Sequence, residues 1–172
     1  MNRDSQKSKV YAAEFMLRSV LEASNVAPTI EVFGSTIVVP QELRFGSLGH
    51  VQKYVDLVLA HPEVNALFGN QSHRPISVRH RKGNASAHYC GGEIAIHHIE
   101  GKNTWAMREI VVLHEIAHHL APGSGHGSEF AGAFLSLVQI FMGVEAHMLL
   151  LSCLEGEGAA WNLPKSREKI FA

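Results

Sequence analysis

Two histidines and a glutamate within one apolar stretch are the residues of this chain best suited to chemistry. His114, Glu115 and His118 stand in the pattern H-E-x-x-H. An α-helix turns about 100° per residue, so side chains four positions apart lie about 40° from each other on one face. Both imidazoles can therefore reach one metal ion, while Glu115 projects toward a water molecule beside that ion. The pattern is a known zinc-hydrolase signature, in which zinc lowers the pKa of water toward about 7 and the carboxylate takes the proton.

A catalytic zinc usually has three protein ligands and one open position, so a further ligand must follow the helix. His126 is the preferred candidate because it lies in a glycine-rich turn, after a proline-glycine stop, that lets the chain turn back. Glu129 and Glu145 are the alternatives, since some H-E-x-x-H enzymes use a later glutamate. We therefore expect Zn2+ on three imidazoles, with Glu115 as the general base, although imidazole ligands also suit other divalent metals.

The stretch HEIAHHLAPGSGHGSEF resembles the H-E-x-x-H…H-G-x-x-F pattern of SprT-like and related small zincins. In that pattern the two helix histidines and the histidine before glycine bind zinc. The resemblance implies these roles for His114, His118 and His126, with Glu115 as base. No zinc-ribbon or other cysteine cluster accompanies the motif, so proteolysis in DNA repair is not implied.

Most of the chain also resembles a second, more specific family. The resemblance is carried by VYAAE near Val10, FGS near Phe45, AHY near Ala87 and WAMREIVVLHE from Trp105. This family consists of uncharacterised predicted metallohydrolases from mycobacteria, other actinobacteria and their phages. Membership implies a metal-dependent hydrolase without naming its substrate.

Hydrophobic periodicity predicts the elements that position these residues. We expect helices over 8–24, 48–59 (capped by Ser47) and 105–120, a hairpin or bent strand over 30–39, strands over 76–81, 88–90 and 93–98, and two C-terminal helices divided at Gly143. This order predicts an α+β, zincin-like fold with a small antiparallel or mixed sheet. We expect one domain over 1–172, with 1–7 and 157–172 flexible. The exposed edge of the strand at Ile94 is expected to align an extended peptide.

Composition limits the classes of protein. The chain has 172 residues, 46% of them hydrophobic, and a net charge of −1, which excludes a strongly basic nucleic-acid binder. Two distant cysteines indicate neither a disulfide framework nor a metal knuckle, and no signal peptide is recognisable, so we expect a cytoplasmic protein. The apolar segment 130–151 contains Gln139, Glu145 and His147, which favours core helices over a membrane span.

Several other polar residues near the motif have two interpretations. We expect His119 to face solvent or to support a metal ligand. For His97 and His98, ordinary surface roles are favoured over substrate binding, because neighbours on a strand point to opposite faces. Tyr89 and His88 are candidates for stabilising the oxyanion of a tetrahedral intermediate.

Charged and aromatic residues elsewhere favour structural roles. Glu109 is expected to be a surface charge. One basic cluster is interpreted as a solvated face, with nucleic-acid contact as the alternative; it comprises Arg74, Arg79, His80, Arg81 and Lys82. A helix-spaced apolar series is expected in the core: Phe130, Phe134, Leu137 and Phe141.

The residues thus favour a zinc-dependent hydrolase, best explained as a metallopeptidase acting on a peptide or protein. The alternatives are a metal-binding adaptor without turnover and a nucleic-acid-associated protein that uses Arg79 and Arg81. No membrane partner is expected, and the oligomeric state, like the substrate, is left open by the sequence.

Overall fold

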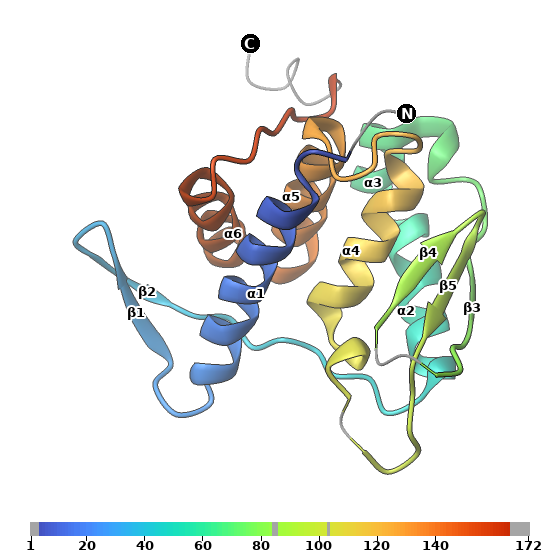
Figure 1. Ribbon diagram of the computed structural model, residues 1–172, viewed down its shortest axis with the longest axis horizontal. Helices are drawn as coiled ribbons and strands as arrows, with labels where there is room; N and C mark the ends of the chain where they lie inside the picture. The colour runs from blue at the N-terminus through green and yellow to red at the C-terminus, as the bar shows by residue number, and fades with distance from the viewer. Residues whose placement is uncertain (1–3, 84–85, 103, 166–172) are drawn as a thin grey trace. The chain divides into compact units, whose positions relative to one another are not determined.

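The computed structural model describes residues 4–83, 86–102 and 104–165, and these form an α+β structure as predicted (Figure 1). The contacts divide the chain into two compact units. The first unit joins the described residues up to Glu42 with Gly123–Leu163, and the second consists mainly of Leu43–Pro122.

The first unit contains three long helices. They are α1 (Lys7–Ala23), α5 (Ser128–Met142) and α6 (Val144–Gly156). In this unit α6 packs against both α1 and α5. On α1 the buried residues recur every three or four positions, which gives one apolar face: Val10, Ala13, Leu17 and Leu21. Gly143, with φ +96°, ends α5 and precedes α6, so the predicted division at this glycine is confirmed.

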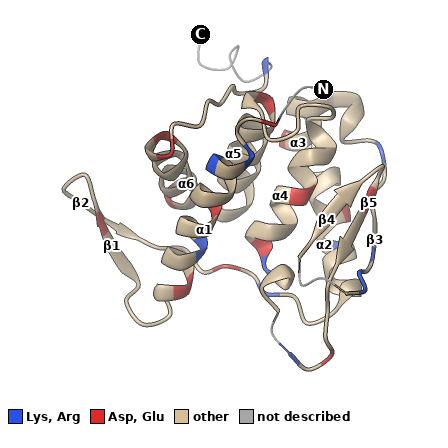
Figure 2. Ribbon diagram, in the orientation of Figure 1, with Lys and Arg blue, Asp and Glu red and all other residues tan. Residues whose placement is uncertain are grey.

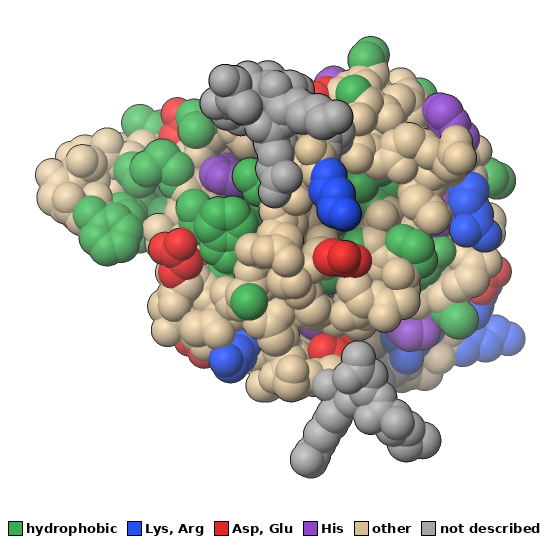
Figure 3. All heavy atoms as spheres, turned by 90° about the horizontal axis from the view of Figure 1, so that it is seen from above, with side chains coloured by type: hydrophobic (Ala, Val, Ile, Leu, Met, Phe, Trp, Pro, Cys, Tyr) green, Lys and Arg blue, Asp and Glu red, His purple; other side chains and the backbone are tan. Residues whose placement is uncertain are grey.

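A two-stranded hairpin completes the first unit. Strands β1 (Thr29–Val32) and β2 (Ser35–Val38) pair antiparallel, with Phe33 and Gly34 as a two-residue loop. Both loop residues have positive φ angles, 48° and 77°, as the tight turn of a twisted hairpin requires. The expected hairpin is therefore confirmed. Apolar side chains near this hairpin are visible in Figure 3.

The second unit is built on a three-stranded sheet. Its strands are β3 (Ser77–His80), β4 (His88–Cys90) and β5 (Glu93–Ile96), in the order β3-β5-β4. Strand β3 runs parallel to β5 and β4 runs antiparallel to it, so the expected mixed sheet is confirmed. Helix α2 (Leu48–Ala60) packs against β3, and α4 (Glu109–Leu120) packs against β4.

The position of β5 corrects one prediction. Ile94 lies in the central strand, whose two sides already pair with β3 and β4. The strand at Ile94 therefore has no open edge that could align a peptide, and the prediction was wrong. A sequence pattern identifies a strand but not its neighbours, because pairing depends on residues distant in the chain.

Two helix boundaries also differ from the predictions. Pro62, which follows the predicted helix 48–59, begins a further helix that was not predicted, α3 (Pro62–Phe68). His61 caps this helix by accepting the Glu63 N–H at 3.3 Å, and proline suits the first helical position because its missing N–H has no helical partner there. The helix predicted over 105–120 is a 3-10 turn, Trp105–Met107, followed by α4, because Arg108 between them is extended (ψ 145°).

The apolar segment 130–151 belongs to the two helices α5 and α6. Among the described residues, no helix combines the length and the apolar character needed to cross a membrane. Parts of the ends expected to be flexible, 1–3 and 166–172, lie outside the described residues. In the described parts of these ends, three residues make specific hydrogen bonds: Asp4, Gln6 and Asn162.

Candidate metal centre

Helix α4 carries His114, Glu115 and His118 in a largely apolar environment. His114 and Glu115 are only 2% and 6% exposed, and His118 is half-buried. The rings of His114 and His118 lie edge to face, with centroids 5.1 Å apart, as expected for side chains one helical turn apart. Burying polar side chains such as His114 and Glu115 is costly, which makes this part of α4 the first candidate for function.

The beginning of α4 is anchored by Glu109. Its carboxylate accepts the backbone N–H of Leu43 at 3.0 Å and the hydroxyl of Tyr54 at 2.5 Å. Burial, together with the negative charge of Glu109, raises the pKa of Tyr54 far above its ordinary value. Glu109 is 3% exposed, so the prediction of a surface charge was wrong. These hydrogen bonds tie the first turn of α4 to Leu43 and to Tyr54 of α2.

The end of α4 is anchored by His119. Its Nε2 lies 3.0 Å from the carbonyl oxygens of both Gln71 and Arg74, and its Nδ1 lies 2.9 Å from the hydroxyl of Tyr89. Because Nε2 must donate to the carbonyls, the neutral ring accepts at Nδ1 and Tyr89 donates to it. Burial lowers the pKa of His119, which favours this neutral form.

These contacts revise two predictions. His119 is 3% exposed, so a solvent-facing role is excluded. The hydroxyl of Tyr89 also accepts the N–H of Gly92 at 3.0 Å, so it is engaged inside the unit. This does not favour Tyr89 as an oxyanion donor, and His88 on the same strand is exposed.

A glycine-rich turn follows α4 and carries His126. Gly123 and Gly125 have φ angles of +77° and +55°, conformations that glycine adopts without strain. The turn closes with a hydrogen bond from the Gly127 N–H to the Ser124 carbonyl at 2.8 Å, and α5 begins at the next residue. His126 is 6% exposed, so the turn buries this imidazole at the start of α5.

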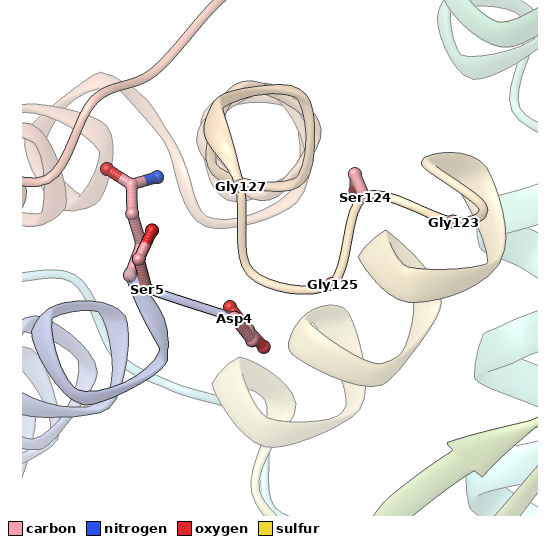
Figure 4. Close-up of a pocket in the computed structure, with 7 residues that line it drawn as sticks. Asp4, Ser5, Gly123, Ser124, Gly125 and Gly127 are labelled. Carbon is pink, nitrogen blue, oxygen red and sulfur yellow. The ribbon is translucent and has the colours of Figure 1, made fainter. Parts of the chain in front are cut away.

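Aromatic rings and an aspartate hold the imidazole of His126. The rings of Tyr11 and Phe130 each lie with their centroids 5.0 Å from that of His126. Asp4 Oδ2 lies 2.6 Å from His126 Nδ1, and Asp4 Oδ1 accepts the His126 backbone N–H at 3.2 Å. Partial burial raises the pKa of Asp4, but the hydrogen bonds from His126 outweigh this, and the pKa is lowered overall. Figure 4 shows Asp4 beside Gly125 of the turn.

Sequence reasoning missed Asp4. It lies 122 residues before His126, in a polar N-terminal stretch that carries no motif, and a single sequence contains no signal for this contact. Asp4 also contributes to a surface pocket of about 280 Å³, together with Ser5, Gln6 and the turn.

The structure brings the side chains of His114, His118 and His126 together through the continuous path of α4 and the turn. Each offers one nitrogen, and these nitrogens all lie within 4.8 Å of one another. Tetrahedral zinc with bonds of about 2.0–2.1 Å requires ligand nitrogens about 3.3 Å apart, so small side-chain rotations suffice. An all-imidazole set of this kind fits a divalent transition metal. The alternatives Glu129 and Glu145 are exposed and do not belong to this group.

The predicted basic cluster is partly engaged in contacts within its own unit. Arg79 forms an ion pair with Glu93, and Arg81 donates to the Ser86 hydroxyl at 2.6 Å. In this unit basic segments lie on β3 and on the loops beside it, and others occur elsewhere, for example near the beginning of α4 (Figure 2). His97 and His98 are half-buried and follow the end of β5, and His97 Nδ1 lies 3.3 Å from the Arg81 carbonyl. These contacts indicate structural roles for Arg79, Arg81 and His97.

Comparisons of the chain with protein-family models, curated proteins and solved structures give no match. The resemblance to SprT-like zincins and to the actinobacterial and phage family therefore stays a prediction.

Proposed function

We propose that this protein is a zincin-like, zinc-dependent hydrolase that cleaves an amide bond of a peptide or protein. The observation that carries the proposal is the set of three imidazoles, from His114, His118 and His126, with ligand atoms within 4.8 Å of one another. Three neutral nitrogen ligands leave a fourth position for water or substrate, which is the arrangement of catalytic zinc.

The buried carboxylate of Glu115 supports hydrolysis rather than metal storage alone. His114, His118 and His126 would hold a zinc ion, which would supply a Lewis acid to lower the pKa of water and to polarise a carbonyl. Glu115 accepts the proton that water loses as it attacks the carbonyl carbon, and then donates this proton to the departing amine nitrogen. Glu115 is 6% exposed, so little bulk water competes for these transfers.

Strand β4 is the element best placed to hold an extended substrate. It packs against α4 and ends the sheet order β3-β5-β4, so within the described residues only one of its edges is paired. A peptide can add to an open strand edge through main-chain hydrogen bonds. We therefore propose that β4 aligns the substrate. The strand at Ile94, β5, cannot do so because both of its edges are paired.

Metal analysis of the purified protein, combined with a screen against a proteome-derived peptide pool, tests the proposal. We expect one zinc per chain, loss of that zinc in His118→Ala, and cleavage of some peptides by the wild type. Glu115→Gln should retain zinc and lose cleavage, because the amide cannot accept the proton. Glu129→Gln, an exposed glutamate on α5, serves as the matched control and should behave as the wild type.

Each result has a defined meaning. Retained cleavage in Glu115→Gln excludes this residue as the base. Stoichiometric zinc without cleavage of any peptide identifies a metal-binding protein without turnover. Unchanged zinc in His118→Ala refutes the metal site.

A further inference from the structure

Asp4 makes two hydrogen bonds with His126, the proposed third zinc ligand. The inference drawn from them rests on the proposed zinc site. We infer that Asp4 is a positioning residue, which fixes the ring of His126 so that Nε2 is directed to the metal ion. Asp4 Oδ2 lies 2.6 Å from Nδ1 of the ring, and Oδ1 accepts the backbone N–H of the same residue at 3.2 Å.

The two contacts set both the orientation and the tautomer of the imidazole. A carboxylate has no proton to donate, so His126 must donate from Nδ1 to Asp4. In the neutral ring the lone pair then lies on Nε2, as ligation through that nitrogen requires. A carboxylate on the second ring nitrogen is a common support for metal-binding histidines, and its loss typically costs about 10–100-fold in metal affinity.

The glycine turn is shaped to admit Asp4. A Cβ atom on Gly125 would lie 3.1 Å from Asp4 Oδ2, which is closer than ordinary contact, and φ at this glycine is +55°. Gly123 has a similar φ of +77°, but a Cβ there would meet nothing within 4 Å. Glycine at 125 thus serves the approach of the carboxylate as well as the turn itself (Figure 4).

The N-terminal segment that carries Asp4 is held in place by hydrogen bonds from Gln6 and Lys9. Gln6 Nε2 donates to the His126 carbonyl at 3.3 Å and to the Ala160 carbonyl at 3.2 Å, and Gln6 Oε1 accepts the Ala160 N–H at 2.5 Å. Lys9 Nζ donates to the Gly158 carbonyl at 2.8 Å. The N-terminal segment is thereby joined both to the ligand turn and to the C-terminal segment, which limits the positions that Asp4 can adopt.

The zinc dissociation constant of the full chain, measured by competition with a chelator, tests the inference. Asp4→Asn should weaken zinc binding by about 10–100-fold, and Asp4→Glu should recover part of the loss because it keeps the carboxylate. Asp56→Asn, which changes an exposed aspartate on α2 bonded to Gln52, is the matched control and should leave the constant unchanged.

Two further measurements separate positioning from general stability. Gly125→Ala and Gly123→Ala place alanine at similar positive φ angles and so incur similar backbone strain. Only the alanine at 125 would displace Asp4. Gly125→Ala should therefore bind zinc more weakly than Gly123→Ala. In metal-free protein, nitrogen-15 NMR of the His126 ring should show the proton on Nδ1 in the wild type and a shift toward the Nε2–H form in Asp4→Asn.

The outcomes distinguish this inference from the proposed function. Wild-type protein without zinc affinity overturns the proposed function. Tight zinc binding that is equal in wild type and Asp4→Asn overturns the inference and leaves the proposed function standing. A wild-type His126 ring with its proton on Nε2 also overturns the inference, independently of any metal measurement.

Discussion

Replacing Gly132 with alanine tests whether the C-terminal segment is packed on α5 as closely as the structure indicates. A Cβ atom built on Gly132 would lie 1.6 Å from the carbonyl oxygen of Asn162, a main-chain atom that cannot rotate away. Asn162 is held there by two hydrogen bonds to Ser128: N–H to carbonyl at 2.9 Å, and Nδ2 to hydroxyl at 3.0 Å. The substitution must therefore displace the segment.

Two opposing effects decide the sign of the change in the free energy of unfolding. Alanine in place of glycine inside a helix normally stabilises by about 0.5–1 kcal/mol. Displacing the segment loses two hydrogen bonds, each contributing about 0.5–1.5 kcal/mol, and forced overpacking costs about 1–3 kcal/mol. The clash outweighs the helix propensity, so we expect Gly132→Ala to lower the free energy of unfolding by about 1–5 kcal/mol.

Urea unfolding of the variant and of Gly49→Ala measures the effect directly. Gly49 lies in α2, and a Cβ there would be 3.7 Å from the Ser47 hydroxyl, an ordinary contact. Gly49→Ala should therefore stabilise the protein by up to about 1 kcal/mol. The two variants should change stability in opposite directions, with faster proteolysis of the C-terminal segment in Gly132→Ala. Stabilisation in both would refute the close packing of Asn162 on α5.

Three further predictions concern the site and its supports. His126→Ala should weaken zinc binding by more than about 100-fold, while Glu129→Ala should not; the reverse order in chelator competition would assign the third ligand to the glutamate. His119→Ala should lower the free energy of unfolding by about 2–4 kcal/mol, because the buried groups it contacts lose their hydrogen-bond partner, and a change below about 0.5 kcal/mol in urea unfolding would contradict that network. The pKa of Tyr54 is raised in the folded protein. Above pH of about 10 the unfolded chain loses the hydroxyl proton that the folded protein keeps beside Glu109. The stabilisation that Tyr54 contributes is therefore present below pH of about 10 and declines at higher pH. Urea unfolding between pH of about 9 and 11 should therefore show a steeper loss in the wild type than in Tyr54→Phe; equal slopes would exclude this residue as the cause.

The sequence by itself was sufficient for features that depend on neighbouring residues. The spacing of His114 and His118 places both on one helical face, and a helix forms there because the surrounding residues are apolar. Ser47 was recognisable as a cap and accepts the His50 N–H at 3.2 Å. Gly143 was recognisable as a division between helices, because only glycine adopts its φ of +96° without strain.

Only the tertiary structure decided which distant residues meet. Glu109 was expected to be a surface charge and His119 to face solvent or to support a metal ligand. Both are buried, and their hydrogen bonds to Leu43 and Arg74 span 66 and 45 positions. Asp4 reaches His126 across 122 positions, and nothing in the spacing of either residue indicates this. A helical face is encoded by local periodicity, whereas the partner of a polar side chain depends on how separate segments pack. The identity of the residue that orients a metal ligand therefore becomes visible only in the folded chain.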